Sequence, residues 1–300
     1  MEYRTLAHTD LTLSAITFGS WAAGGWMWGK SNRDEAVKAI KAAYDGGVTS
    51  IDTAPIYGQG ESERIVGEAI RGIPRDQVQI LTKFGMRWDL PQGEFAFKSK
   101  DNQDNPIDIY KYAGKESVIK ECEDSLRRLG TDYIVRYAGV CNYDAALLED
   151  AAKLIDLVSD QIPYSMVNRG MDRDIIPYCI RNEKSVIAYS PLERGLLTGK
   201  MQPGYRFAEG DHRKENPFFT DESIKRTNAF LEKLQPLADE KKATLGQLVI
   251  RWTIEHPGIT VALVGARNPE QAIQNAKAAD IILTPEELQF INQQIDQMLK

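Results

Sequence analysis

Three side chains in this sequence have the types and the spacing of an acid/base centre: Asp52, Tyr57 and Lys83. Asp52 ends the short aliphatic run Val48–Asp52, and Lys83 ends the next such run, Ile80–Lys83. A charged residue at the end of a buried strand indicates that a ligand or another side chain interacts with that charge. Ligands of α/β proteins sit at the carboxyl ends of parallel strands. We therefore expect both charges at the mouth of one site, with Tyr57 over it from the loop.

The chemistry that these types predict is proton transfer to or from an oxygen atom. A nearby ammonium favours phenolate, so Lys83 is expected to lower the pKa of Tyr57 from its usual value of about 10. Asp52 is expected to keep Lys83 charged. A phenol tuned in this way can donate a proton to a carbonyl or accept one from an alcohol near neutral pH. A structural salt bridge at a rim, with Tyr57 merely packing, is the alternative, and spacing alone does not separate the two.

A second signal is the segment Gly265–Gln271, which follows a predicted buried strand and opens a helix. Asn268 is the expected N-cap, and Pro269 occupies the first helical position. Free amides at a helix N-terminus, with Arg267 in front of them, indicate an anion site. Ordinary capping with a solvated Arg267 is the alternative. The segment Ser190–Gly199 also follows a strand and contains glycines, so the two segments together could hold both ends of a dinucleotide.

The aromatic residues give weaker signals. Four tryptophans fall in loops after predicted strands, where they either line an apolar substrate pocket or pack at the rim: Trp21, Trp26, Trp28 and Trp88. His8 and His256 are expected at turns without a role, and His212 is expected to be solvated in a long loop. None of the three histidines has neighbours in a metal-ligand pattern.

The elements that must position these residues alternate between strand and helix. A small hairpin over residues 3–13 is followed by seven predicted strands, over residues 15–18, 48–52, 78–83, 133–141, 157–162, 185–190 and 259–264. This alternation indicates parallel β/α units. The motif G-x-G-x-x-G of the doubly wound alternative is absent, which favours a (β/α) barrel. A closed barrel needs eight strands, however, and the chain supplies seven.

Two segments are too long for simple connections, residues 84–114 and 191–219, and such segments are usually lids, binding loops or disordered. No linker or repeat divides residues 1–300, so one domain is expected. The net charge of −6 and the scattered basic residues argue against a nucleic-acid partner. No apolar run suggests a membrane span or a signal region. Three widely spaced cysteines form no disulfide pattern, and a reducing cytoplasm is the expected location.

Several segments resemble a known family, and they occur in the family's order from the first strand to the last. They are Phe18-Gly-Ser-Trp21, Ile51-Asp-Thr-Ala-Pro-Ile-Tyr-Gly58, Thr82-Lys83, Leu126-Arg-Arg-Leu-Gly-Thr-Asp-Tyr133, Ala138-Gly-Val-Cys-Asn142, Tyr189-Ser-Pro-Leu192, Gly195-Leu-Leu-Thr-Gly-Lys200 and Gly265-Ala-Arg-Asn-Pro-Glu-Gln271. The chain resembles the aldo-keto reductase family, specifically its bacterial branch that is similar to potassium-channel β subunits. The resemblance implies a (β/α)₈ barrel and NADP(H)-dependent reduction of aldehydes or ketones.

The same resemblance assigns roles to individual residues. It makes Tyr57 the proton donor, tuned by Lys83 and Asp52, and it places Asn142 and Gln161 on the nicotinamide carboxamide. The partners it implies are a small carbonyl substrate and a nucleotide cofactor, with neither nucleic acid nor membrane.

The rest of the cofactor site follows from the resemblance as well. Tyr189 is expected to stack on the nicotinamide ring, and Arg267 is expected to meet the 2′-phosphate. Residues along the pyrophosphate are Ser190, Leu192, Gly195 and Leu197, and residues around the adenosine are Gln271, Gln274 and Asn275. The remaining positions expected at the cofactor are Gly19, Ser20, Trp21, Asp52, Cys141, Pro191, Lys200 and Gly265. Cys141 stands where the family usually has serine.

The chain departs from the family between Ile134 and Val135. Family members continue there with the fourth strand, a histidine near its end, a helix and the start of the fifth strand. This sequence runs directly into what resembles the end of the fifth strand, so roughly one βα unit of about 30 residues or more is missing. The loss would account for the seven strands and would remove the family's catalytic histidine. We expect an open or distorted barrel, lower stability, impaired activity and a tendency to form homo-oligomers.

Two other functions remain open at the level of sequence. The chain could bind NADP(H) without catalysis and act as a sensor or interaction protein. It could also be a Schiff-base aldolase that uses Lys83, although a lysine beside Asp52 should stay protonated and be a poor nucleophile.

Overall fold

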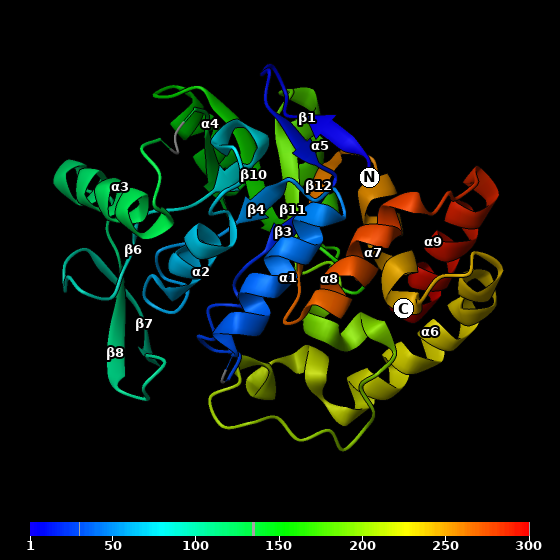
Figure 1. The fold of residues 1–300 in the computed structure, drawn as a ribbon. Coiled ribbons are helices and arrows are strands. Elements are labelled where there is room, and N and C mark those ends of the chain that lie inside the picture. Colours follow the sequence, from blue (N-terminus) through cyan, green and yellow to red (C-terminus); the bar gives the residue numbers. More distant parts are fainter. Residues whose placement is uncertain (30, 134–135, 300) are drawn as a thin grey trace.

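A computed structural model describes residues 1–29, 31–133 and 136–299. Seven strands form one parallel sheet in the order β5-β4-β3-β12-β11-β10-β9 (Figure 1). Their bounds are β3 Ile16–Gly19, β4 Ser50–Asp52, β5 Gln79–Leu81, β9 Ala138–Cys141, β10 Leu157–Pro163, β11 Ser185–Tyr189 and β12 Ile259–Gly265. The predicted count of seven strands is confirmed.

This sheet is curled, as a barrel requires. Asp52 on β4 and Gln161 on β10 form a hydrogen bond of 2.8 Å, although three strands lie between β4 and β10 in the sheet order. In a flat sheet those two strands would be about 19 Å apart, because neighbouring strands are spaced by about 4.8 Å. The side chains can meet only if the sheet bends round on itself. The predicted barrel-type α/β fold is therefore confirmed.

The curled sheet is open at one place in the described part of the chain. Its two edges are β5 and β9, which are consecutive along the chain among the parallel strands. The position of the predicted departure, between Ile134 and Val135, lies outside the described residues. Just before it, α3 (Lys115–Leu129) ends at Gly130, which adopts the left-handed φ of 66°.

Helices cover the outside of the sheet, and a hairpin lies at the end of the sheet where its strands begin. The helices besides α3 are α1 Arg33–Asp45, α2 Glu61–Ala69, α4 Ala145–Ala152, α5 Ile175–Arg181, α6 Asp221–Glu240, α7 Leu245–Glu255, α8 Pro269–Ala276 and α9 Pro285–Leu299. Side chains cap two of these helices, since Asn32 accepts from the Glu35 amide at the start of α1, and Thr284 and Glu287 cap each other at the start of α9. Strands β1 (Tyr3–Thr5) and β2 (Thr12–Ser14) form the predicted hairpin. Within the described ranges, no helix is both long and apolar enough to span a bilayer.

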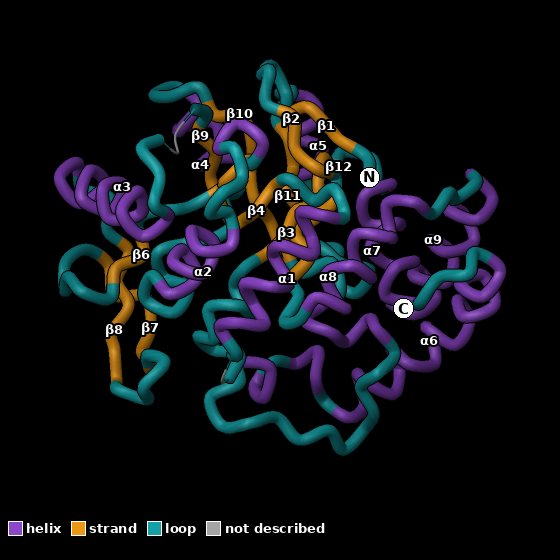
Figure 2. Tube along the Cα trace, viewed as in Figure 1, coloured by secondary structure: helices purple, strands orange, loops and turns teal. Residues whose placement is uncertain are grey.

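The two long segments differ in structure. Residues 84–114 are not a disordered loop but form a three-stranded antiparallel sheet of β6 (Met86–Arg87), β7 (Glu94–Lys100) and β8 (Pro106–Lys111), drawn near α3 in Figure 1. Its side chains pack in one apolar cluster with Trp26 and Tyr57. Alternation along β7 and β8 is weak because both strands are largely exposed, so the sequence pattern did not reveal them. Residues 191–219 form a loop with short 3₁₀ turns (Figure 2).

A close helix crossing holds α2 against α3. A Cβ atom added to Gly67 would lie 2.6 Å from the carbonyl oxygen of Leu129 and 2.8 Å from that of Arg128. Both are backbone atoms, so relieving the clash requires the helices to shift. We expect Gly67→Ala to lower the free energy of unfolding by about 1–3 kcal/mol, because the clash outweighs the gain of about 1 kcal/mol that alanine brings to a helix. Urea unfolding followed by circular dichroism measures the change.

The control for this crossing is Gly170→Ala. No atom lies within 4 Å of a Cβ at Gly170, so the control should leave the urea midpoint unchanged. A Gly67→Ala protein as stable as the parent would mean that the two helices do not cross as closely as described.

Candidate active site

The structure brings Asp52 and Lys83 together at the carboxyl ends of the adjacent strands β4 and β5. The Lys83 ammonium donates to both carboxylate oxygens of Asp52 at 2.8 Å and to the carbonyl oxygen of Thr53 at 2.9 Å. Asp52 is only 3% exposed. The predicted ion pair is present and partly buried.

Tyr57 lies over this pair from the loop after β4, as expected. The Lys83 nitrogen is 5.1 Å from the centre of the Tyr57 ring, and the indole of Trp21 stacks on the same ring at 5.9 Å. The predicted direction of the phenol pKa is wrong, however. Burial raises the pKa of Tyr57 to about 12, and the opposing effect of the Lys83 charge is smaller. The phenol is therefore protonated throughout the neutral range.

The charge state of Lys83 agrees with the prediction. Burial alone would lower the pKa of Lys83, but the Asp52 carboxylate and the Tyr57 phenol raise it above its ordinary value in sum. A lysine that stays protonated has no lone pair for attack on a carbonyl carbon. This state disfavours the Schiff-base alternative.

Side chains from β9, β10 and β11 form the opposite wall of the site. The Gln161 amide nitrogen donates to Asp52 at 2.8 Å, and its oxygen lies 3.8 Å from the Cys141 sulfur, which also accepts from the Asn142 side chain at 3.4 Å. The Tyr189 hydroxyl donates to the Asn142 side-chain oxygen at 3.0 Å. These four predicted cofactor residues thus form one hydrogen-bonded group that reaches Asp52.

Backbone geometry marks several of the segments expected at the cofactor. Gly19 and Gly265 face each other on β3 and β12, and a Cβ on Gly265 would lie 3.3 Å from the Gly19 carbonyl oxygen. Ser190 and Arg194 have left-handed φ angles of 58° and 53° although neither is glycine. Such angles recur where backbone is held for function. The Gly195 and Leu197 amides donate to Leu192, which closes a tight turn.

The helix start expected at the adenosine end is built as predicted. Asn268 caps α8 by accepting from the Gln271 amide at 2.9 Å, and the Gln271 side chain accepts from the Arg267 amide at 2.9 Å. The Asn275 side chain donates to Gly265 at 3.1 Å, while the Gln274 oxygen accepts from Gln247 at 2.9 Å. In the described part of the chain the Arg267 guanidinium has neither a hydrogen bond nor an ion pair.

Arg267 belongs to a cluster that sequence reasoning missed. Its guanidinium lies 5.4 Å from the Trp28 ring, and the guanidinium of Arg213 lies 5.0 Å from the same ring. Burial, reinforced by the neighbouring Arg213 charge, lowers the pKa of Arg267. Arg213 is itself paired with Asp211 at 2.6 Å. Among the described residues the Asp211 carboxylate therefore pairs with Arg213 alone, which leaves the positive charge of Arg267 for an anion.

His212 was expected to be solvated, and that prediction is wrong. Its ring stacks on Trp21 at 4.9 Å and meets the edge of Trp28 at 4.9 Å. The Nδ1 atom lies 2.6 Å from the Met27 carbonyl oxygen, so it carries the proton and donates. Burial lowers the pKa of His212. These contacts hold the loop 191–219 against the loop after β3. The two loops are far apart in the sequence, so no local pattern predicts the contact.

The remaining predicted site residues make fewer polar contacts with the site. Ser20 donates to the Asp52 carbonyl oxygen at 2.7 Å and supports the end of β4. Trp21, Trp26 and Trp88 pack in one apolar cluster with Tyr57. The side chains of Pro191 and Lys200 have no hydrogen bond in the described structure. Within residues 1–29, 31–133 and 136–299, no group of three histidine, cysteine or acidic side chains is arranged to hold a metal ion.

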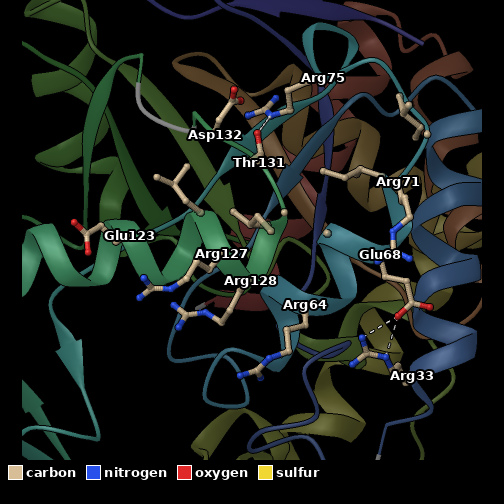
Figure 3. Close-up of a pocket in the computed structure, with 17 residues that line it drawn as sticks. Arg33, Arg64, Glu68, Arg71, Arg75, Glu123, Arg127, Arg128, Thr131 and Asp132 are labelled. Atoms are coloured by element: carbon tan, nitrogen blue, oxygen red, sulfur yellow. Dashed lines mark hydrogen bonds and ion pairs between the residues drawn. The ribbon is translucent and has the colours of Figure 1, made fainter.

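A hollow of about 1120 Å³ lies between α2 and α3 rather than at these residues (Figure 3). Six arginines line it: Arg33, Arg64, Arg71, Arg75, Arg127 and Arg128. Arg33 pairs with Glu68 and Arg128 with Glu63, so much of the positive charge is balanced. None of the predicted site residues lines this hollow, and we do not place the chemistry there.

Comparison with known proteins identifies the family. The sequence profile of the Aldo/keto reductase family matches residues 15–134 and 134–296. Aldo-keto reductase YhdN of Bacillus subtilis is 33% identical, and the match covers 97% of this chain and 93% of that protein. The NADH-specific methylglyoxal reductase of Escherichia coli is also 33% identical, over 95% of both chains. A probable voltage-gated potassium channel subunit beta of Arabidopsis thaliana is 28% identical, over 98% of this chain and 97% of that protein.

Solved structures agree with this assignment. The glycerol dehydrogenase AKR11B4 of Gluconobacter oxydans superposes with a TM-score of 0.86 at 28% identity, over 99% of this chain and 96% of that one. An aldo/keto reductase of Klebsiella pneumoniae, solved with NADP and acetate, superposes with a TM-score of 0.71 at 26% identity, over 98% and 95%. The resemblance seen in the sequence motifs is confirmed over nearly the whole chain.

Proposed function

The chain belongs to the aldo/keto reductase family, and from this premise we propose that it reduces aldehydes or ketones to alcohols with NADPH. The observation that carries the proposal is the contact of Tyr57 with the Lys83–Asp52 pair, where the ammonium lies 5.1 Å from the phenol ring. A protonated phenol beside a fixed positive charge can give its proton to a carbonyl oxygen and is then stabilised as phenolate.

Each of the three residues has a distinct role in this proposal. Tyr57 donates the proton from its hydroxyl group to the substrate oxygen. Lys83 is the cation that stabilises the phenolate left behind. Asp52 and the Thr53 carbonyl hold the ammonium in place, since three hydrogen bonds of 2.8–2.9 Å fix it. Trp21, stacked on the phenol, keeps water from one face of the ring.

The residues present fit a nicotinamide dinucleotide phosphate. Arg267 has no anionic partner in the described residues and stands before the N-terminus of α8, which suits a phosphate. The facing glycines Gly19 and Gly265 leave the backbone open for close approach. Asn142 and Gln161 would hold the carboxamide. When bound there, a reduced nicotinamide would supply a hydride for the carbonyl carbon. Because one relative is named NADH-specific and a solved neighbour contains NADP, the cofactor preference has to be measured.

We further propose that one βα unit is missing between Ile134 and Val135. The family profile matches in two segments that meet there, and the sheet edges β5 and β9 flank that point. The family's catalytic histidine would go with the missing unit. Loss of one acid/base partner commonly costs about 10²–10⁴ in rate, so a weak reductase is expected.

A second candidate function, NADP(H) binding without catalysis, is favoured by one observation. The phenol remains a weak acid, because burial raises its pKa to about 12 although the charge of Lys83 and a hydrogen bond with it both act to lower that pKa. A protein in this state would hold the cofactor and turn over slowly or not at all.

One experiment separates the two functions. Fluorescence titration with NADPH and NADH measures binding, and NADPH consumption with a simple aldehyde is then followed in the same sample. Binding with turnover supports the reductase, and binding without turnover supports the silent protein. If neither nucleotide binds, both proposals fail.

The role of Arg267 gives a separate prediction. Arg267→Gln should weaken NADPH binding about tenfold to hundredfold, since a hydrogen bond to a charged group contributes about 1.5–3 kcal/mol. The affinity for NADH, which lacks the 2′-phosphate, should stay unchanged. The control is Arg127→Gln, whose side chain is 66% exposed on α3. Equal losses for both nucleotides would contradict the assignment of Arg267 to the 2′-phosphate.

A further inference from the structure

The first turn of α2 packs against the ends of β4 and β5, the strands that carry the ion pair of the site. Ser62 and Glu63 lie in this turn, and both are 0% exposed. The Ser62 hydroxyl lies 2.9 Å from that of Thr53, the residue after Asp52. The Ser62 amide donates to the Tyr57 carbonyl oxygen at 3.1 Å. This turn therefore contacts the segments that present two of the three catalytic side chains.

The Glu63 carboxylate bridges the third of these segments to α3. One of its oxygens accepts from the Thr82 hydroxyl at 2.7 Å, and the other accepts from the Arg128 guanidinium at 2.5 Å. Thr82 immediately precedes Lys83 in the chain. Hydrogen bonds to an ionised acceptor are stronger than those between neutral groups. The carboxylate therefore holds the Thr82 side chain against α2.

Arg128 reaches Glu63 by crossing over the start of α2. Gly60, the N-cap of α2, has a left-handed φ of 88°, and a Cβ atom there would lie 2.5 Å from the Cδ atom of Arg128. Any side chain at residue 60 would displace Arg128. The Arg128 guanidinium also lies 3.4 Å from the Ser125 hydroxyl on α3. The cation that holds Glu63 is thus itself fixed between two helices.

This bridge lies at the open edge of the curled sheet. In the described part of the chain, β5 pairs with β4 alone, over the three residues Gln79–Leu81. Lys83 lies two residues beyond the end of this strand. A strand in a closed barrel has hydrogen-bonded neighbours on both sides. Because β5 has a neighbour on one side only, the segment that carries Lys83 needs another support, and the Glu63 carboxylate provides one.

We propose that Glu63 is a positioning residue that fixes Thr82 and thereby holds the Lys83 ammonium beside the Tyr57 phenol. This inference rests on the proposed function, because it requires that Lys83 stabilises the phenolate formed when Tyr57 gives up its proton. Glu63 acts through Thr82 and Lys83 and touches neither cofactor nor substrate. The positive charge is needed most after the proton has left, so its misplacement should slow turnover and leave substrate binding unchanged.

The test compares two replacements of Thr82. Thr82→Val removes the hydroxyl group, keeps the branched shape and leaves the pair of Glu63 with Arg128 intact. Its turnover number should fall about tenfold to hundredfold, because small displacements of a catalytic group have effects of that size. The KM for the aldehyde and the dissociation constant of NADPH should stay within about twofold of the parent. Thr82→Ser keeps the hydroxyl and should restore most of the turnover.

A double variant tests whether Glu63 acts through Thr82. Glu63→Gln removes the charge that holds both partners, so it should lower turnover and, because Arg128 loses its partner, the melting temperature. Combined with Thr82→Val, it should lower turnover little further, since two residues that act as one unit are not additive. If Glu63→Gln fails to fold, the comparison of Thr82→Val with Thr82→Ser decides alone.

Thr253→Val is the matched control, because it removes a buried hydroxyl that donates to the Val249 carbonyl oxygen at 2.9 Å within α7. It should keep the parent's turnover. Steady-state assays of NADPH consumption, fluorescence titration and thermal unfolding supply the measurements.

A Thr82→Val protein with a lower melting temperature and the parent's turnover would mean that the bridge serves the fold alone. Such a result overturns the inference and leaves the reductase proposal standing. Equal losses in Thr82→Val and Thr82→Ser, or a loss that appears in KM or in NADPH affinity, would also overturn it. A parent protein that binds NADPH but reduces no aldehyde would refute the proposed reductase, and the inference with it.

Discussion

Replacement of Tyr57 by phenylalanine is expected to lower the turnover of an aldehyde by about 10²–10⁴-fold and to leave NADPH affinity unchanged. Only the hydroxyl group is removed. The ring still stacks on Trp21 at 5.9 Å and still lies 5.1 Å from the Lys83 ammonium, so the pocket keeps its shape. The loss should therefore appear in the turnover number. Steady-state assays of NADPH consumption, together with fluorescence titration, measure the two quantities separately.

The control is Tyr44→Phe, which removes a hydroxyl group that donates to Gln77 at 3.0 Å on the outer surface. It should retain full turnover. A Tyr57→Phe protein with the parent's turnover would refute the proton-donor role. Because burial raises the pKa of Tyr57 to about 12, ionisation of the phenol should not reduce turnover anywhere between pH 6 and pH 9.

Replacement of Lys83 by methionine is expected to affect both stability and activity. The change keeps most of the apolar stem but leaves the Asp52 carboxylate, only 3% exposed, without its cation. Breaking one partner of a buried pair typically lowers the free energy of unfolding by about 3–5 kcal/mol. Turnover should fall as well, because the phenolate loses the positive charge that stabilises it. Urea unfolding at pH 7 and the aldehyde assay measure the two effects.

A double variant separates the two consequences. Asp52→Asn combined with Lys83→Met removes both charges, so most of the lost stability should return while turnover stays low. Recovery of turnover in the double variant would mean that the ion pair serves the fold alone. A single Lys83→Met variant as stable as the parent would indicate that Asp52 finds another partner or becomes protonated.

The sequence by itself was sufficient for the parallel strands, for several helix starts and for the residues at their ends, but not for the antiparallel sheet of β6, β7 and β8. Asn32, Thr284 and Asn268 are caps whose signals lie within four residues, and the structure contains all three. Asp52 and Lys83 could be paired because parallel strands bring their carboxyl ends to one edge. The seven strands, and with them the open sheet, also followed from local pattern.

Only the tertiary structure decided what surrounds these residues. Burial of Tyr57 outweighs the Lys83 charge and reverses the expected direction of its pKa, and burial depends on every segment that covers the ring. His212 reaches Trp21 across nearly two hundred positions of sequence, and Glu63 joins Thr82 after β5 to Arg128 on α3. Periodicity and capping depend on residues that are near neighbours along the chain, so the sequence alone predicts them. Desolvation and stacking act between segments that meet only after folding, so no local pattern contains them.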